Sequence, residues 1–188
     1  MIYNSIVKGR FISRPNRFIA YAEIDGKEEI CHVKNTGRCR ELLIPEADII
    51  LEISDNPNRK TKFDLISVYK NGRLINIDSQ APNKIAAELL PKLFPDYIIK
   101  PEQKYKNSRF DFYLESANKR AFAEVKGVTL ENENIVMFPD APTERGVKHI
   151  NELIQAAENG FEAYILFIIQ MNQVKYLIPN YETHREFG

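Results

Sequence analysis

The stretch that decides how this chain folds reads SRFDFYLESANKRAFAEVKGV, residues 108 to 128. Apolar and polar side chains alternate along both halves of the stretch, which is typical of two β-strands. The turn-forming residues between the halves are Ser116-Ala117-Asn118-Lys119. The two strands are therefore expected to form an antiparallel hairpin. A loop of two or four residues gives one register, whereas a loop of three or five residues would slide the strands past each other.

The expected register brings acidic side chains together. It pairs Glu115 with Arg120, Tyr113 with Phe122, Asp111 with Glu124, and Arg109 with Lys126. Because alternate side chains of a strand share a face, Asp111, Glu124 and Lys126 converge on one patch. Like charges opposite each other destabilise an antiparallel pair, so this arrangement favours a cation between the two carboxylates.

A divalent metal fits this patch. Mg²⁺ or Mn²⁺ takes oxygen ligands, here Asp111, Glu124 and the backbone carbonyl of Val125, and keeps positions open for a phosphate and a water. Lys126 is then placed to polarise the scissile phosphate or to help deprotonate the water, so the expected reaction is phosphodiester hydrolysis. The alternative is a solvated outer strand face. Glu88 is either a further outer carboxylate or a surface glutamate.

The flanking segments predict an αβββαβ order. Pro82-Asn83 opens a helical pattern that Pro91 and Pro95 end, and a strand is expected from 97 to 105. A second helix is expected from 142 to 159. Residues 161–170 are apolar on both faces, which predicts a central strand of the sheet.

The second helix begins beside several polar side chains. Asp140 or Thr143 is available as its cap. Arg145 and Lys148 are either phosphate contacts near the helix N-terminus or solvated charges. His149 is a weaker candidate, as a general acid.

The first half of the chain has a different pattern. Short alternating segments separated by turns such as Asp25-Gly26 and Asn71-Gly72 predict a small β-barrel or sandwich of five or six strands. The period changes after Asp78. We therefore predict an α/β protein with two domains, residues 1–80 and 81–188.

Charge is balanced over the whole chain but clustered locally. Lys plus Arg and Asp plus Glu each number 26, so no global field indicates a polyanionic partner. Cations nevertheless gather near aromatic residues and turns in the first half, as in barrels that hold nucleic acid without reading its sequence. The predicted nucleic-acid contacts there are Arg10, Arg14, Arg17, Lys34, Arg38, Arg59 and Lys60. Ordinary solvated charges are the alternative.

Other classes of protein fit poorly. Two cysteines, Cys31 and Cys39, are too few for a disulfide scaffold and badly spaced for zinc. No apolar run approaches a membrane span and no signal-peptide pattern opens the chain, so we expect a cytoplasmic protein. A phosphosugar or nucleotide site lacks a glycine-rich signature.

Several longer motifs resemble those of one family. They are Arg14-Pro15-Asn16-Arg17-Phe18, Asn35-Thr36-Gly37-Arg38, Glu41-Leu42-Leu43, Asn58-Arg59-Lys60-Thr61, Pro82-Asn83 with Glu88, Ser108-Arg109-Phe110-Asp111-Phe112, residues 124–130, and residues 137–146 followed by Lys148-His149. With these motifs in order along the chain, the sequence resembles the sugar fermentation stimulation protein A (SfsA) family of bacteria and archaea.

The resemblance implies an N-terminal OB-like barrel and a C-terminal domain similar to PD-(D/E)xK nucleases. Its site residues would be Asp111, Glu124, Lys126 and, on a helix, Glu88. It also implies DNA binding, with RNA left open, and a role in sugar metabolism. Members usually continue with another helix and strand, so we expect a truncated C-terminus and leave the oligomeric state open. Two functions remain: a nonspecific DNA-binding, metal-dependent nuclease, and a non-catalytic DNA-binding regulator.

Overall fold

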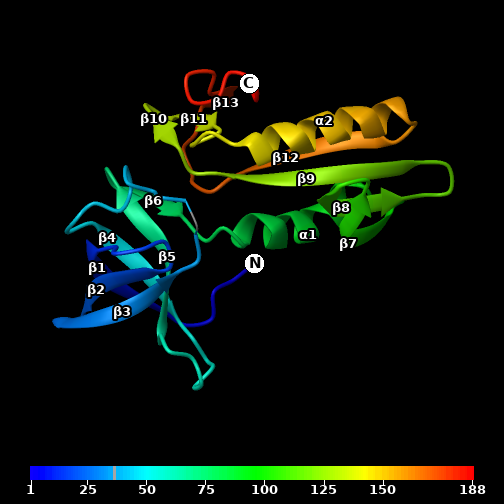
Figure 1. The fold of residues 1–188 in the computed structure, drawn as a ribbon. Helices are drawn as coiled ribbons and strands as arrows, with labels where there is room; N and C mark the ends of the chain where they lie inside the picture. The colour runs from blue at the N-terminus through cyan, green and yellow to red at the C-terminus, as the bar shows by residue number, and fades with distance from the viewer. Residues whose placement is uncertain (36) are drawn as a thin grey trace. The chain divides into compact units, whose positions relative to one another are not determined.

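The computed structural model describes residues 1–35 and 37–188; Thr36, within an expected motif, lies outside them. The described chain divides into two compact units (Figure 1). The first comprises residues 1–80 together with 170–173, and the second comprises 81–169 and 174–188. Among the described residues, no helix is both long enough and apolar enough to cross a membrane.

The first unit is a small barrel. Its strands are β1 (Ile6–Ser13), β2 (Ile19–Ile24), β3 (Lys27–Val33), β4 (Asp48–Ile53), β5 (Phe63–Lys70) and β6 (Arg73–Asn76). They follow the order β3-β2-β1-β4-β5-β6, and a parallel pairing of β3 with β5 closes the first five into a barrel. The expectation of five or six strands is confirmed.

Alternation of side chains builds the barrel core. Ala20, Ala22 and Ile24 of β2 point inward and are buried, while the residues between them are more exposed. The hairpin turns contain Asp25-Gly26 and Asn71-Gly72, all four residues with positive φ, as two-residue hairpin loops require.

A buried carboxylate fastens one loop to the barrel. Asp64 of β5 is 2% exposed and accepts hydrogen bonds from both terminal nitrogens of Arg59, at 2.6 and 2.7 Å. Lys34 Nζ lies 3.0 Å from one of its oxygens and His32 Nδ1 lies 3.0 Å from the other. Burial alone would raise the pKa of Asp64, but these partners outweigh it and lower the pKa to about 2.

The second unit is a sheet with a helix on each face. Its larger elements are α1 (Ala81–Leu93), β7 (Ile98–Tyr105), β8 (Ser108–Glu115), β9 (Arg120–Val128), α2 (Glu144–Glu158) and β12 (Glu162–Ile169). Buried residues of α1 pack on one face of the sheet order β12-β9-β8-β7, and buried residues of α2 pack on the other (Figure 1). A separate small sheet contains β10 (Glu131–Asn132), β11 (Ile135–Phe138) and β13 (Tyr176–Pro179).

The predicted hairpin register is confirmed next to the loop, but the predicted pair of Arg109 with Lys126 is not among the ladder pairs. Glu115 pairs with Arg120 and Tyr113 with Phe122, and the loop between the strands is closed by a bond from Ser116 N to Lys119 O. The ladder stops at the pair formed by Phe112 and Ala123. Asp111 and Glu124 thus follow the last ladder pair, and they lie where the two strands separate.

Two expectations for this unit were wrong, and three small strands were not predicted. Residues 161–170 do not form a central strand: β12 pairs with β9 alone among the described strands and is only partly buried. The small strands β10, β11 and β13 were not foreseen. Helix α1 continues to Leu93 through Pro91, because the missing N–H of a proline near a helix end removes only one bond.

The N-terminus of α2 is capped by Thr143, one of the two expected candidates. Its hydroxyl accepts from Gly146 N at 3.0 Å. Gly146 has no room for a side chain, because a Cβ there would lie 2.8 Å from Thr143 and 2.9 Å from the ring of Phe187. The glycine therefore admits these two neighbours and not a ligand.

Candidate active site

Asp111 lies where β8 leaves β9. Its Oδ2 accepts from the backbone N–H of Val125 at 2.7 Å, and its Oδ1 accepts from Asn83 Nδ2 of α1 at 2.8 Å. Phe110 packs on the α2 side of the sheet and Phe112 on the α1 side, so the alternation of faces is broken at this residue. The Asp111 carboxylate thus occupies the position that the next ladder bond would have filled.

Asp111 is held in an unfavourable charge environment. Burial raises its pKa, and the neighbouring charge of Glu124 acts in the same direction. The hydrogen bonds from Val125 and Asn83 and the charge of Lys126 act against this shift but do not reverse it. The ionised carboxylate pair therefore lacks full compensation from the protein.

Glu124 has one engaged oxygen and one without a partner. Its side chain is 6% exposed; Oε1 accepts from Lys126 Nζ at 2.7 Å and lies 2.5 Å from His149 Nδ1. Oε2 is buried and has no hydrogen-bond partner among the described residues. A buried carboxylate oxygen without a partner is costly, and a bound cation would relieve that cost.

Val125 presents its backbone to the same place. The N–H and C=O of a strand residue point to the same neighbouring strand, and the Val125 N–H points to Asp111. Its carbonyl is therefore directed to the edge of β9 where the ladder has ended. Asp111, Glu124 and this carbonyl form an all-oxygen set of the type that Mg²⁺ or Mn²⁺ prefers.

His149 connects Glu124 to Arg145. Arg145 Nε donates to His149 Nε2 at 3.4 Å, so a neutral ring carries its proton on Nδ1 and donates it to Glu124. His149 is 5% exposed and both of its ring nitrogens are engaged. These contacts argue against the expected role as a general acid and favour one in positioning Glu124.

The structure shows no direct contact of the other predicted site residues of this unit with Asp111 or Glu124 among the described contacts. Glu88 is exposed on α1, and helical geometry places it about 140° around the axis from Asn83. Arg145 is exposed and reaches the site through His149. Lys148 turns instead to the backbone carbonyl of Asn107 at 3.3 Å.

A second acidic cluster, Glu144, His184 and Glu186, lies at the start of α2. His184 Nδ1 accepts from the backbone N–H of Thr143 at 3.0 Å. The proton of a neutral ring is then on Nε2, which lies 3.5 Å from Glu144. Because neither nitrogen has a free lone pair, this cluster is a poor ligand set.

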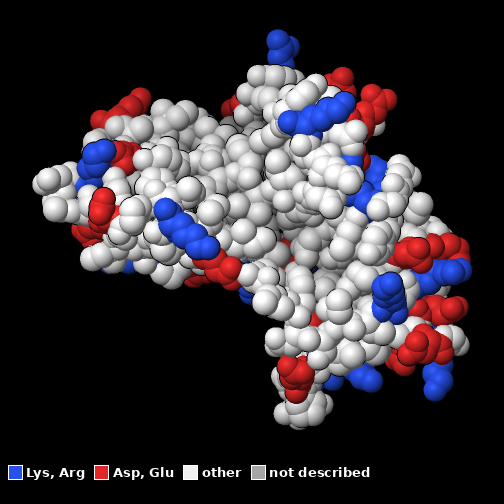
Figure 2. All heavy atoms as spheres, turned by 180° about the vertical axis from the view of Figure 1, so that it is seen from behind, with Lys and Arg blue, Asp and Glu red and all other residues white. Residues whose placement is uncertain are grey.

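Most predicted cations of the first unit have protein partners. Arg10 pairs with Glu46 at 3.1 Å, and Lys34 and Arg59 pair with Asp64. Arg14 donates to four backbone carbonyls at 2.6 to 2.8 Å, so its role is structural and we remove it from the expected nucleic-acid contacts. On the face shown in Figure 2, Lys and Arg lie among Asp and Glu, in agreement with the zero net charge.

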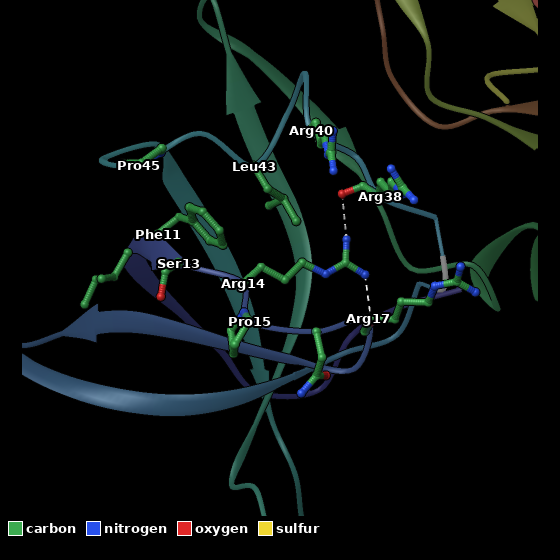
Figure 3. Close-up of a pocket in the computed structure, with 11 residues that line it drawn as sticks. Phe11, Ser13, Arg14, Pro15, Arg17, Arg38, Arg40, Leu43 and Pro45 are labelled. Carbon is green, nitrogen blue, oxygen red and sulfur yellow. Dashed lines mark hydrogen bonds between the residues drawn. The ribbon is translucent and has the colours of Figure 1, made fainter.

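Arg17, Arg38 and Lys60 are exposed and, unlike Arg10, Lys34 and Arg59, pair with no acidic side chain among the described residues. Arg17 and Arg38 also line a pocket of about 470 Å³ together with Arg40 (Figure 3). These three arginines are exposed side chains around one pocket, where a ligand could contact all of them.

Comparison with known proteins places this geometry in a family. Residues 80–188 match the domain described as "Sugar fermentation stimulation protein RE domain", and residues 12–77 match the "SfsA N-terminal OB domain". A sugar fermentation stimulation protein homolog of Clostridium beijerinckii is 63% identical, over all of this chain and 84% of the relative. The chain belongs to the sugar fermentation stimulation protein family.

Two other members of the SfsA family also match most of this chain. The homolog of Desulfitobacterium hafniense is 60% identical over all of this chain and 83% of the relative. The structure of Pyrococcus furiosus SfsA superposes with a TM-score of 0.86 at 30% identity, covering 99% of this chain and 82% of that one. That structure is described as a complex with Ca²⁺. The predicted family and the OB-barrel fold are confirmed.

Two contacts of the SfsA site were missed by the sequence reasoning. Asn83 was noted only as a helix-opening motif, and His149 only as a possible acid, because side-chain partners across separate elements leave no local signal. The Pro82-Asn83 motif and the Lys148-His149 pair were nevertheless among the residues that carried the resemblance. Polar residues within shared motifs are thus the signal that could have found both.

Proposed function

We propose that this chain is a DNA-binding, divalent-metal-dependent nuclease whose site consists of Asp111, Glu124, Lys126 and the carbonyl of Val125. The observation that carries the proposal is Glu124 Oε2, a buried carboxylate oxygen without a partner beside a second carboxylate whose pKa is raised. Both features are costly without a cation and favourable with one. The Ca²⁺ complex of the P. furiosus relative supports a divalent ion in this family.

Different residues of the site would bind the metal, orient its ligands and stabilise the phosphate. When bound, Mg²⁺ or Mn²⁺ supplies Lewis acidity to a phosphate and to a water. Asp111 and Glu124 hold the ion, while Asn83 and the Val125 N–H fix the orientation of Asp111. Lys126, 2.7 Å from Glu124, places a positive charge where a scissile phosphate would gain negative charge.

Arg145 provides a second positive charge near the site. One of its N–H donors goes to His149, and the rest of its guanidinium group suits a phosphate oxygen. Glu88 lies about 140° around α1 from Asn83 and has no role in this proposal, and Lys148 contacts the flanking backbone at Asn107.

The test is cleavage of supercoiled plasmid, linear duplex and single-stranded DNA with Mg²⁺, Mn²⁺ or EDTA. The wild type is compared with Asp111→Asn and Lys126→Ala, and with Asp96→Asn and Lys104→Ala as exposed controls of the same charge change. Cleavage that needs metal, is lost in the first two variants and survives in the controls is the expected result. Equal loss in all four variants, or cleavage that persists in EDTA, would reject the proposal.

A non-catalytic DNA-binding regulator is the alternative, favoured by the exposed arginines of the first unit, which are independent of the metal site. DNA binding without cleavage in either metal would favour this alternative. A role in sugar fermentation rests on the name of the relatives.

A further inference from the structure

The first unit contains a pocket that combines cations with an apolar base. It measures about 470 Å³, within the ~300–1,000 Å³ range of small-ligand sites. Phe11 and Leu43 are buried at its base, 2% and 8% exposed, and Pro15 and Pro45 flank them. Figure 3 shows Arg17, Arg38 and Arg40 grouped on the opposite side from Phe11 and Pro45.

Three of the four arginines that line the pocket have no acidic partner among the described residues. Arg17, Arg38 and Arg40 are exposed, and none of them pairs with an acidic side chain in the described part of the chain. Among the described residues that line the pocket, none is acidic. Three unneutralised positive charges around one cavity favour an anionic ligand.

The pocket is held in shape by the protein itself. Arg14 Nη1 donates to the carbonyls of Gly37 and Arg38, both at 2.8 Å, and Arg14 Nη2 donates to those of Arg17 at 2.7 Å and Asn35 at 2.6 Å. Figure 3 shows the bonds to Arg38 and Arg17. One guanidinium group thus ties together the two segments that carry Arg17 and Arg38. The ligand need not order these segments, so the entropy cost of binding is reduced.

Side-chain caps fix the same two segments a second time. Asn16 Oδ1 accepts from the N–H groups of Phe18 and Ile19, at 2.9 and 3.0 Å. Asn35 Oδ1 accepts from Gly37 N at 2.7 Å, and its Nδ2 donates to the carbonyl of Ile77 at 2.8 Å. These are the bonds of a preformed site and not of a flexible basic loop.

We propose that this pocket binds an unpaired nucleotide of single-stranded DNA, with phosphates at Arg17, Arg38 and Arg40 and the nucleobase against Phe11 and Leu43. A duplex presents phosphates but keeps its nucleobases stacked inside. It would therefore leave the apolar floor of the pocket, formed by Phe11 and Leu43, unused. Phe18 follows Arg17 in the chain and is 54% exposed, which offers a further surface for stacking. The inference rests on the proposed DNA binding and does not depend on cleavage.

The test measures affinity in EDTA, where metal-dependent cleavage cannot occur. Fluorescence anisotropy compares a labelled oligothymidine with a duplex of the same length, using the full chain. Tighter binding of the single strand is expected, as is a drop of about tenfold or more in the Arg17→Ala, Arg38→Ala, Arg40→Ala triple variant. The slope of log affinity against log salt should fall by up to about 2, since each lost phosphate contact contributes ~0.7.

A matched triple variant controls for the loss of charge. Lys27, Lys60 and Lys62 are exposed in the same unit and do not line the pocket, so replacing them with alanine should affect the single strand much less. Equal losses in the two triple variants, or a duplex bound as tightly as the single strand, would overturn the proposal. A single-stranded RNA bound more tightly than the DNA would also overturn it.

A second pair of variants keeps the arginines in place. Ser13 lines the pocket and is exposed, so Ser13→Glu introduces a carboxylate there, whereas Ser5→Glu adds the same charge outside it. We expect only Ser13→Glu to weaken single-strand binding, with both proteins melting as the wild type does. If no DNA binds in EDTA, the DNA-binding part of the proposed function fails too; if only the duplex binds, this inference fails alone.

Discussion

Glu124 Oε1 and His149 Nδ1 lie 2.5 Å apart, joining the third strand of the second unit's sheet to the helix that covers it. The contact is buried on both sides, since each side chain is 6% exposed. The other oxygen, Glu124 Oε2, is buried and has no hydrogen-bond partner among the described residues. The orientation of the carboxylate is therefore set by a residue 25 positions away in the chain.

Replacing His149 should weaken metal binding. His149→Leu removes the donor to Glu124, and loss of such a supporting contact typically costs about 10–100-fold in metal affinity. His149→Asn keeps an N–H donor near the Nδ1 position and should retain most of the affinity. Titration calorimetry with Mn²⁺ measures both. A leucine variant that binds Mn²⁺ like the wild type would remove the positioning role.

Asp111→Asn should stabilise the metal-free protein at neutral pH. The raised pKa means that the folded protein binds the proton of Asp111 more tightly than the unfolded chain does. Its contribution to stability is thus fully present below the unfolded pKa and is lost as the pH rises through the folded pKa. Asparagine avoids that loss, and a flip of the Asn83 amide restores their hydrogen bond.

Thermal melts in EDTA and in Mn²⁺ test this second prediction. Without metal the Asp111→Asn variant should melt above the wild type at pH 7, and the difference should shrink at low pH. Added Mn²⁺ should raise the melting temperature of the wild type alone. A variant that melts lower in EDTA at pH 7 would mean that ionised Asp111 stabilises the fold.

Asp64 should give the opposite pH dependence. Its pKa is lowered from 3.8 to about 2, so its stabilisation is present above the unfolded pKa and is lost as the pH falls through the folded one. The shift corresponds to about 2 kcal/mol of unfolding free energy. Asp64→Asn should lose about that amount at pH 7, with the gap to the wild type closing between about pH 4 and 2.

Urea denaturation at several pH values measures this gap. Asp55→Asn is the matched control, because Asp55 is exposed on the segment that leads to Arg59. The control should follow the wild type at every pH. A gap between wild type and Asp64→Asn that stays constant down to pH 2 would contradict the ion-pair explanation.

The cap of α2 offers a prediction independent of the metal. Thr143→Ala removes the acceptor for Gly146 N and should lower the unfolding free energy by about 1 kcal/mol. Thr143→Ser retains the acceptor and should lose less. Denaturation in EDTA separates the two variants, and an equal loss in both would indicate that the methyl group of Thr143 matters more than its hydroxyl.

Local pattern was enough to predict much of the fold. The alternation in β8 and β9 and the turn chemistry of residues 116–119 define their register, because both signals are contained in one short stretch. The edge position of β12 was not predictable in this way. An apolar run indicates that both faces of a strand are buried, but it does not indicate which strands pair with it or on how many sides.

The sequence predicted which residues would lie near Asp111 better than it predicted their hydrogen bonds. The hairpin register predicts that Asp111 and Glu124 lie near each other, whereas the ladder's end at Phe112 and the bond from Val125 N to Asp111 arise from backbone separation. Clusters of Lys and Arg in the sequence were the least reliable signal for predicting nucleic-acid contacts. Arg14 and Arg59 look alike in sequence, but their guanidinium groups bond to backbone carbonyls and to a buried carboxylate, respectively.

The four residues of the β8–β9 loop determine more than a turn. One inserted residue there would shift β9 by one position against β8, so that its side chains now packed toward α1 would face α2 and the reverse, and Glu124 would leave Asp111. The loop begins five residues after Asp111, roughly 15 Å along an extended strand. A change in the length of this loop, more than a change in its composition, would therefore disrupt the core and the proposed metal site together.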